Sequence, residues 1–378
     1  MCMKRVVIIN RVLPQYRLEF FSRLRDSLAA HDVELVLVYG DGEASERAKG
    51  DLVDLEWGHA IRNRRLSAGK LVAYWQPALG YLHQADLVIV EQANKLILNY
   101  LLQIGQGFGG PRVAFWGHGR NFQAISASSP AEAFKKLLSR RVHWWFAYND
   151  LSAQVVRENG FPAEKITVVQ NAIDTKSLRS AVANVDSASK ITIRDKYGVR
   201  GSTIGVYFGA LYPAKRLPFL IEAAKLVRDR IPDFELLIVG DGVHRTLVEN
   251  ESRSHSWLKY LGPRFGTEKA EILAIGDVFL LPGLVGLAIL DAFAAGLPII
   301  TTESASHGPE IAYLEPFANG IMTPPSLAGY VDAVAGLLTE PERLSAMSKS
   351  ALSAGGHYTL ENMVTNFSNG IQQALEAT

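Results

Sequence analysis

The chain has 378 residues, which is too long for one ordinary hydrophobic core and suits two domains. Its net charge of +1 and its charged fraction of 20% give no strong global field, so we expect no nucleic-acid partner. The single cysteine, Cys2, excludes an internal disulfide and a cysteine-based zinc site, which fits a reducing compartment. The apolar run at residues 6–9 is too short for a signal peptide, so we expect a cytoplasmic protein.

Short apolar runs alternate with helical patterns along the first half of the chain, which predicts parallel strands joined by crossover helices. The predicted strands are residues 6–9, 34–39, 87–91, 113–116, 144–148 and 166–170. The predicted helices between them are residues 18–30, 94–104 and 130–141. This order indicates an N-terminal Rossmann-like domain over residues 1–178.

A small, polar stretch at residues 179–189 interrupts the alternation and has the composition of a linker. The alternation then restarts, which predicts a second Rossmann-like domain over residues 190–355. Its predicted strands are residues 203–208, 235–239, 257–261, 278–281 and 299–302. Its predicted helices are residues 217–230, 267–275 and 287–295.

The C-terminal part is helical by pattern from residue 326 onward, with a break at Gly355-Gly356. We expect residues 356–378 to form a helix that packs back on the N-terminal domain.

Residues 278–300 are apolar and long enough to cross a membrane, but glycine and proline interrupt them repeatedly. We interpret this segment instead as a strand, a glycine turn, a helix and a second strand.

A first motif, VYFGALYPAKR, places a glycine and two cations between a predicted strand and a predicted helix. Gly209 permits a tight turn after the strand. Lys215 and Arg216 come directly before the helix, where backbone N–H groups and the helix dipole favour an anion. The motif therefore predicts a diphosphate site, and solvated loop charges are the alternative.

A second motif, LPGLVGLAILDAFAAGLP, is a strand end, a glycine-containing turn and a helix. Gly283 and Gly286 allow close approach of the backbone, and the N–H groups of Gly286, Leu287 and Ala288 would face a phosphate. Asp291 lies one turn further on the same helix face and can accept hydrogen bonds from ribose hydroxyls. An acid that complements the helix dipole is an equal alternative for Asp291.

These motifs, in this order and spacing, resemble the GT-B-fold glycosyltransferases of family 4 across nearly the whole chain. Further matching segments are VQNAID, VGDG, LG after the strand predicted at 257–261, DVFLLP and HGPEIAY. The resemblance implies two Rossmann-like domains facing a central cleft. It also implies a retaining transferase that binds a UDP- or GDP-sugar mainly through its C-terminal domain and requires no cofactor or metal.

Two positions depart from the family pattern. The family typically has arginine after the glycine of the first motif, where this chain has Ala210. The Glu-x7-Glu pair of the family reads Gly283 and Asp291 here, so the carboxylate expected on the donor sugar is missing. Glu303 and Glu310, in the loop after the next strand, are both candidates to replace it.

The resemblance also assigns the remaining donor contacts. Gly240 and the loop of Leu261 and Arg264 would surround the base of the nucleotide. His118, in the segment FWGHGRN, matches the cleft histidine of the family, which orients the transferring sugar. A structural or solvent-facing histidine is the alternative for His118.

The acceptor-side candidates lie in the first domain. Arg120 and Asn121 are neighbours of His118, and the loop after the first strand supplies Arg11, Tyr16 and Arg17. Ordinary loop residues explain these last three equally well. Because that loop contains no glycine, it is not a dinucleotide fingerprint, which disfavours a Rossmann oxidoreductase.

We therefore expect a glycosyltransferase that passes a sugar from a nucleotide-sugar to a glycan or lipid-linked acceptor. A non-catalytic nucleotide-sugar-binding protein of the same fold is the alternative. The basic segments at residues 134–145 and 62–65 are candidates for peripheral contact with a membrane, and the solvated face of a helix is the other interpretation.

Overall fold

The computed structural model describes residues 3–47, 52–69, 71–119, 140–303 and 307–377. The chain divides into two compact units. Unit 1 comprises Met1–Ile173 and Leu360–Thr378, and unit 2 comprises Asp174–Thr359.

Among the described residues of unit 1, seven parallel strands form one sheet in the order β3-β2-β1-β6-β7-β8-β9. Both faces of this sheet are covered, so its strands are almost continuously apolar, as in the VVII run of β1. The strands are β1 Lys4–Asn10, β2 Val33–Gly40, β3 His59–Ile61, β6 Leu87–Glu91, β7 Arg112–Gly117, β8 Trp144–Ala147 and β9 Ile166–Val168.

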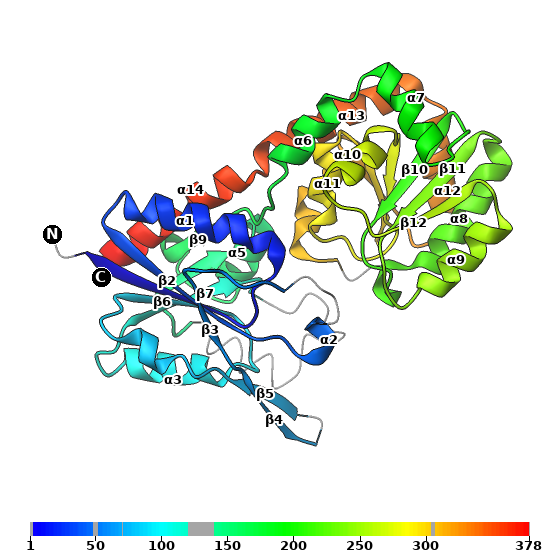
Figure 1. Cartoon of the computed structure of the whole chain (residues 1–378). Helices are drawn as coiled ribbons and strands as arrows, with labels where there is room; N and C mark the ends of the chain where they lie inside the picture. The colour runs from blue at the N-terminus through cyan, green and yellow to red at the C-terminus, as the bar shows by residue number, and fades with distance from the viewer. Residues whose placement is uncertain (1–2, 48–51, 70, 120–139, 304–306, 378) are drawn as a thin grey trace. The chain divides into compact units, whose positions relative to one another are not determined.

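Helices α1 and α14 pack side by side over one face of this sheet, and α3 lies on the other (Figure 1). Phe367 of α14 packs the C-terminal helix onto the rest of unit 1. The centroid of its ring lies 4.5 Å from that of Phe146, on which it stacks, and 5.4 Å from that of Phe20 of α1. The helices are α1 Leu18–Ala29, α2 Ala44–Arg47, α3 Ile97–Gln106, α5 Asp150–Glu158 and α14 Leu360–Glu376, with short 3-10 turns η1 Gln15–Arg17, η2 Leu79–Leu82 and η3 Ala163–Lys165.

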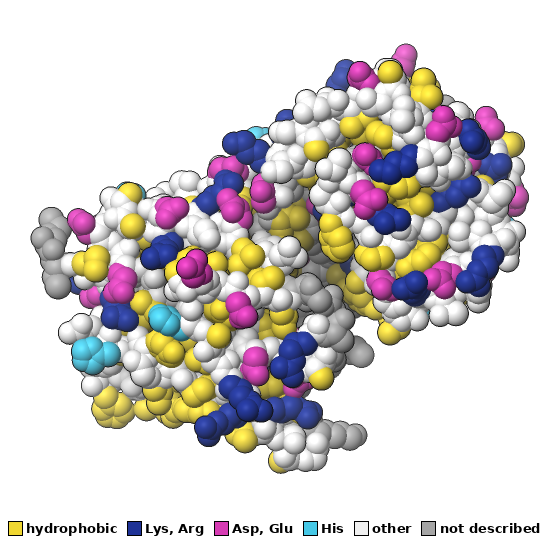
Figure 2. Space-filling model, in the orientation of Figure 1, with side chains coloured by type: hydrophobic (Ala, Val, Ile, Leu, Met, Phe, Trp, Pro, Cys, Tyr) yellow, Lys and Arg dark blue, Asp and Glu magenta, His cyan; other side chains and the backbone are white. Residues whose placement is uncertain are grey.

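A small antiparallel hairpin extends from unit 1, formed by β4 Arg64–Ala68 and β5 Leu71–Trp75. All residues of β4 are exposed, whereas β5 places Tyr74, which is buried, and Trp75 against the core. Lysine and arginine side chains gather at this end of unit 1 (Figure 2). The hairpin therefore supplies a basic surface.

The described part of unit 2 holds a six-stranded parallel sheet in the order β12-β11-β10-β13-β14-β15. Its strands are β10 Thr203–Phe208, β11 Phe234–Val239, β12 Leu258–Gly262, β13 Val278–Leu280, β14 Ile299–Thr302 and β15 Gly320–Thr323. Its helices are α6 Lys176–Ala183, α7 Ser187–Lys196, α8 Leu217–Arg230, α9 Arg245–Ser254, α10 Gly266–Ala274, α11 Ala288–Ala294, α12 Leu327–Leu338 and α13 Pro341–His357, with 3-10 turns η4 Pro213–Lys215 and η5 Pro309–Tyr313.

Each sheet has a point where the strand order reverses. In unit 2 the chain moves outward from β10 in one direction and from β13 in the other, and β10 and β13 are paired. In unit 1 the corresponding neighbours are β1 and β6. Ligands of such sheets bind beyond the carboxyl ends of the strands at these reversal points. The loops after these four strands are therefore the expected positions of a ligand site.

The prediction of two doubly wound parallel sheets is confirmed. Residues 278–300 form β13, α11 and β14, as predicted, and no described helix is long and apolar enough to span a membrane. The helix predicted at residues 130–141 falls almost entirely outside the described residues.

The linker predicted at residues 179–189 is wrong, because most of this stretch belongs to α6 and α7. Asp186 caps α7 by accepting a hydrogen bond from the N–H of Ser189 at 2.8 Å. Alanine favours helix, and α6 packs against α10, so a polar composition here marks a helix surface and not a flexible segment.

The break predicted at Gly355-Gly356 is also wrong, since α13 continues through both glycines to His357. A Cβ atom on Gly355 would lie 2.9 Å from the carbonyl oxygen of Phe293. The glycine therefore allows α13 to pack closely on α11 and does not end the helix.

Candidate functional site

Glycines allow three strand ends of unit 2 to approach one another. The N–H of Gly209 donates to Val239, and the N–H of Gly240 donates to Gly262, both at 3.0 Å. Gly240 has a φ of +141°, and a Cβ atom there would lie 1.9 Å from the carbonyl oxygen of Gly209. Only glycine fits this position, so the loops after β10, β11 and β12 form one closely packed edge. Leu261 lies near the end of β12.

Lys215 ends the 3-10 turn after β10 and is 6% exposed. Its Nζ atom donates to the carbonyl oxygen of Leu284 at 2.6 Å, and the N–H of Leu284 donates to Ala214 at 2.8 Å. Burial lowers the pKa of Lys215 to about 8, and the negative charge of Glu310 opposes this shift. The ammonium group is thus held at the junction of the loops after β10 and β13.

Arg216 begins α8 with a left-handed backbone, at a φ of +57°. Its Nη1 atom donates to Oγ1 of Thr302 at 2.7 Å, and its guanidinium lies 4.2 Å from the centroid of the Phe219 ring. Arg216 therefore braces the loop ends of β10 and β14, in addition to the anion contact predicted for it.

Gly283 lies where a side chain has no room. A Cβ atom there would lie 2.3 Å from the carbonyl oxygen of Ala214 and 2.5 Å from Cα of Lys215. The glutamate of the family pattern cannot stand at this position without moving the backbone. By contrast, a Cβ atom on Gly286 would meet nothing closer than 3.8 Å. Leu287 then occupies the N-cap position of α11, whose first residue is Ala288.

His307 joins the loop after β13 to the end of β14. Its Nδ1 atom accepts from the N–H of Val285 at 3.1 Å, and its Nε2 atom lies 2.8 Å from the carbonyl oxygen of Thr302. Burial lowers the pKa of His307, the positive charge of Lys215 lowers it further, and the bond to Thr302 opposes both. A neutral ring that donates through Nε2 satisfies both contacts. The sequence motif HGPEIAY contained this residue, but its positioning role was not predicted.

Glu310 lies in the 3-10 turn η5 and is 5% exposed. A Cβ atom on Gly308 would lie 2.6 Å from Oε2 of Glu310, so the glycine leaves room for this carboxylate. Its negative charge raises the pKa of Lys215, against the larger effect of burial. Glu303, the other candidate replacement, is exposed.

Asp291 stands in the first turn of α11, as predicted, but its Oδ1 atom forms an ion pair with Nζ of Lys269 at 2.6 Å. The carboxylate therefore lies against α10. Arg264 forms a longer ion pair with Glu268, at 3.7 Å, within the segment that starts the same helix.

In unit 1, His118 follows β7 and is half-buried. Its ring lies edge-on to Tyr148, with the centroids 4.1 Å apart. The next residue, Gly119, has a φ of +77° and donates its N–H to Oε1 of Gln92 at 3.0 Å. This fixes the backbone after β7. Arg120 and Asn121 lie outside the described residues.

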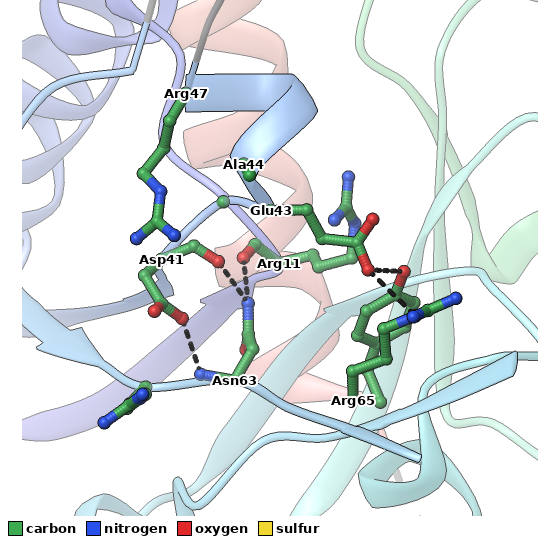
Figure 3. A pocket seen from close by; sticks show the side chains of 10 residues that line it. Arg11, Asp41, Glu43, Ala44, Arg47, Asn63 and Arg65 are labelled. Atoms are coloured by element: carbon green, nitrogen blue, oxygen red, sulfur yellow. Dashed lines mark hydrogen bonds and ion pairs between the residues drawn. The ribbon is translucent and has the colours of Figure 1, made fainter. Parts of the chain in front are cut away.

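A polar pocket of about 520 Å³ lies beyond the carboxyl ends of β1, β2 and β3 (Figure 3). Its lining includes Arg11, Asp41, Glu43, Asn63 and Tyr74. Of these residues, only Arg11 was predicted from the sequence as a site residue. The others come from loops and from the exposed hairpin, which carry no recognisable motif.

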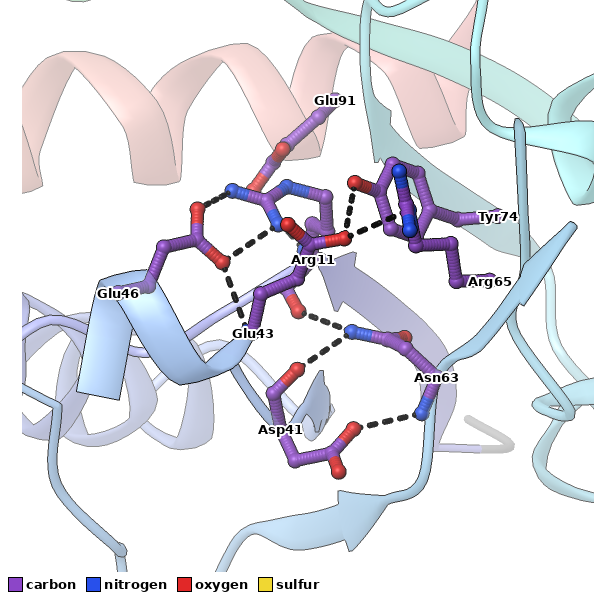
Figure 4. Close-up of polar contacts among 8 residues, drawn as sticks. All are labelled: Arg11, Asp41, Glu43, Glu46, Asn63, Arg65, Tyr74 and Glu91. Atoms are coloured by element: carbon purple, nitrogen blue, oxygen red, sulfur yellow. Dashed lines mark hydrogen bonds and ion pairs between the residues drawn. The ribbon is translucent and has the colours of Figure 1, made fainter. Parts of the chain in front are cut away.

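Arg11 is at the centre of the polar contacts beside this pocket (Figure 4). Its guanidinium forms two hydrogen bonds to the carboxylate of Glu46, which hold the pKa of Glu46 at about 2. Its backbone N–H donates to Oε1 of Glu91 at 3.0 Å, and burial raises the pKa of Glu91. Arg11 thus connects β1 to β6 at the reversal point of the sheet.

The other two candidates of this loop, Tyr16 and Arg17, differ in their exposure to solvent. Tyr16 is 46% exposed, whereas Arg17 is only 4% exposed. The guanidinium of Arg17 donates to Oδ1 of Asn171 at 2.5 Å and lies 5.0 Å from the centroid of the Trp116 ring. Arg17 therefore faces the interior of unit 1, and its contact with an acceptor stays a prediction.

Comparison with known proteins gives one match to a family and several to individual proteins. Residues 202–340 match the family model described as glycosyl transferases group 1. Over 190 residues the chain is 27% identical to a GDP-mannose-dependent alpha-(1-6)-phosphatidylinositol monomannoside mannosyltransferase of Mycolicibacterium smegmatis. This alignment covers 47% of the chain and 48% of that protein, so the chain spans about half the length of this relative.

Two solved structures resemble the whole chain. Anabaena Alr3699/HepE in complex with UDP has a TM-score of 0.71 at 15% identity, covering 97% of this chain and 99% of that one. Sucrose-phosphate synthase from Thermosynechococcus elongatus has a TM-score of 0.69 at 13% identity, covering 99% and 100%. At such identities the likeness concerns the fold.

Proposed function

We propose that the chain moves a sugar from a nucleotide-sugar to an acceptor with retention of configuration, because residues 202–340 match the glycosyl transferases group 1 and the fold is GT-B. The names of similar proteins support a UDP- or GDP-sugar as the donor, since one binds UDP and another depends on GDP-mannose. The proposed acceptor is a glycan or a lipid-linked sugar, in glycoconjugate assembly at the cytoplasmic face of a membrane.

One observation carries the proposal: a nearly buried lysine stands at the reversal point of the unit 2 sheet. Lys215 links the loops after β10 and β13 through its bond to Leu284. Burial without a carboxylate bonded to the amine disfavours the charged form and lowers the pKa of Lys215 to about 8. A bound diphosphate would supply the missing negative charge, so this position favours an anionic ligand.

We place the rest of the donor around this lysine. The diphosphate contacts Lys215 and Arg216 and the turn of Gly286, Leu287 and Ala288. The base lies at the closely packed edge formed by Gly209, Gly240, Leu261 and Arg264. Asp291 keeps its Oδ1 atom on Lys269 and offers its other oxygen to the ribose.

Catalysis in this scheme comes from charge placement. As the bond between the sugar and the diphosphate breaks, negative charge grows on the departing phosphate. A preorganised cation in a dry site stabilises this charge more than it stabilises the intact donor, which lowers the barrier. We assign His118 of unit 1 to orienting the transferring sugar.

Glu310 is our candidate for the carboxylate that Gly283 cannot provide. It is buried, it lies near Lys215, and Gly308 makes room for it. In the proposed site it accepts hydrogen bonds from hydroxyls of the donor sugar. Glu303, which is exposed, is the weaker candidate.

The absence of a side chain at Gly283, together with Ala210, favours a second candidate function. A protein of the same fold could bind a nucleotide-sugar without turning it over. Binding would then be retained, and no variant of the site would change the rate of donor breakdown.

The test compares binding with turnover in the full chain. UDP, GDP and their sugars are screened by thermal shift, because a ligand that binds the folded state raises the melting temperature. Donor breakdown is then measured for the wild type, Glu310→Gln and His118→Ala, with Glu315→Gln as a matched control at an exposed position. The proposal predicts slower turnover in the first two variants only. Binding with equal background rates in all four proteins would favour the non-catalytic alternative.

A further inference from the structure

Hydrogen bonds hold the walls of the polar pocket beside Arg11. Asn63 ties its two sides together, since its backbone N–H donates to Oδ1 of Asp41 at 2.7 Å and its Nδ2 atom donates to the carbonyl oxygen of Arg11 at 2.8 Å. On the opposite side, the hydroxyl of Tyr74 donates to Oε1 of Glu43 at 2.6 Å. The strand ends and the hairpin are thereby held in one arrangement (Figure 4).

The charges of this pocket are unevenly paired. Its lining includes four arginines and two carboxylates. Arg11 is bound to Glu46, and Arg65 lies 3.3 Å from Glu43. Within the described residues, the two remaining arginines, Arg47 and Arg62, form no ion pair. The pocket therefore holds two exposed guanidinium groups whose charge no carboxylate among the described residues neutralises.

Guanidinium groups match oxyanions in geometry as well as in charge. Each presents a planar fork of N–H donors that can bind two oxygens of a phosphate or a carboxylate at once. Figure 3 shows Arg47 directed from α2 toward the side of the pocket where Asp41 lies. The carboxylates of Asp41 and Glu43, in turn, accept hydrogen bonds from hydroxyl groups. A hydroxylated ligand that also carries an oxyanion suits both kinds of group.

We propose that this pocket binds an acceptor sugar that carries an oxyanion, with Arg47 and Arg62 as the groups that select it. A volume of about 520 Å³ accommodates one sugar ring with its acidic group. This inference rests on the proposed function only for the role of the ligand as acceptor. Such an oxyanion is present both in a soluble sugar phosphate and in a phosphate group that links a sugar to a lipid.

The test measures binding to the full chain without a donor. Mannose 6-phosphate is titrated by calorimetry at low ionic strength, and mannose serves as the neutral probe. The variants are Arg47→Gln, Arg62→Gln and the double variant. Arg64→Gln is the matched control, because Arg64 is exposed and lies next to this segment but does not line the pocket. In parallel, binding to phosphatidylcholine vesicles with and without phosphatidylglycerol is measured, with mannose 6-phosphate as competitor.

We expect mannose 6-phosphate to bind, mannose not to bind, and the double variant to weaken binding by about tenfold or more, with Arg64→Gln within about twofold of the wild type. Vesicle binding that depends on Arg47 and Arg62 and is competed by the sugar phosphate also supports the pocket, and identifies a lipid as the source of the oxyanion. The proposal is overturned if neither mannose 6-phosphate nor the vesicles with phosphatidylglycerol bind to the chain. Equal weakening by Arg64→Gln would do the same, because it would show a diffuse basic surface.

Donor turnover, measured on the same proteins, keeps this inference separate from the proposed function. A chain that binds the sugar phosphate but never turns over a donor would contradict the proposed function and leave the pocket standing.

Discussion

The turn that carries Lys215 and the turn that carries Leu284 each donate a hydrogen bond to the other. The ammonium group of Lys215 donates to the carbonyl oxygen of Leu284, and the N–H of Leu284 donates to the residue before Lys215. The group that we assign to the diphosphate is therefore also the group that holds the loop after β13. Binding and loop position depend on the same side chain.

Replacing Lys215 by methionine should strongly reduce donor turnover. Methionine keeps most of the buried volume but removes the cation, and loss of one preorganised donor at a developing anion lowers kcat by about 10²–10³-fold. The carbonyl oxygen of Leu284 would also lose its partner, at a cost of about 1–3 kcal/mol in unfolding free energy. Steady-state kinetics and urea unfolding measure the two effects.

Lys349→Met is the control for this variant, because Lys349 is exposed on α13. It should leave both kcat and stability unchanged. A Lys215→Met protein with wild-type turnover would remove Lys215 from the mechanism.

The lowered pKa of Lys215 predicts opposite pH trends for stability and for ligand binding. Between pH 8 and the ordinary value of 10.5, the unfolded chain holds a proton that the folded chain has lost. The contribution of Lys215 to stability therefore rises with pH across this window. Affinity for UDP or GDP should fall over the same window, because only the charged amine attracts a diphosphate.

Both trends are measured between pH 7.0 and 9.5 as differences between the wild type and Lys215→Met, which cancels the titration of other groups. Identical pH profiles for the two proteins would show that Lys215 keeps an ordinary pKa.

Much of the fold could be predicted because buried parallel strands are recorded in the sequence as apolar runs. β1 and β11 are such runs, and the motifs at Gly209 and Gly283 follow strands that prove to be neighbours. Exposed elements leave no such record. All residues of β4 are in contact with solvent, so the hairpin that supplies Tyr74 and Arg65 to the pocket was not predicted.

The residue roles that failed or stayed open depend on contacts between distant parts of the chain. Arg17 is buried partly by Met363 of α14, whose sulfur lies 3.5 Å from its Nη1 atom, and no local pattern indicates this. The choice between Glu303 and Glu310 needed the position of Lys215. The restricted space at Gly283 comes from the turn after β10, some seventy residues earlier in the sequence.

The two glycines of the turn after β13 should differ sharply on substitution by alanine. At Gly283 the new Cβ atom would overlap the backbone of Ala214 and Lys215, so we expect a loss of about 1–3 kcal/mol in stability and a displaced Lys215. At Gly286 the nearest atom is 3.8 Å away, so the fold should tolerate alanine. Thermal unfolding compares the two variants.

Gly283→Glu extends this comparison to the family pattern. Restoring the glutamate should lower the melting temperature and should not raise donor turnover, because the backbone leaves no space for its Cβ atom. Higher turnover in this variant would show that the turn can rearrange.

Arg17→Met should destabilise unit 1 without acting on the acceptor. Oδ1 of Asn171 would lose its buried donor, at a cost of about 1–3 kcal/mol. Five of the six tryptophans belong to unit 1, and Trp116 lies against Arg17, so tryptophan fluorescence during urea unfolding follows this unit. Arg157→Met, at an exposed position of α5, is the control and should unfold like the wild type. If Arg17 instead binds the acceptor, its variant will keep wild-type stability and raise the KM for the acceptor.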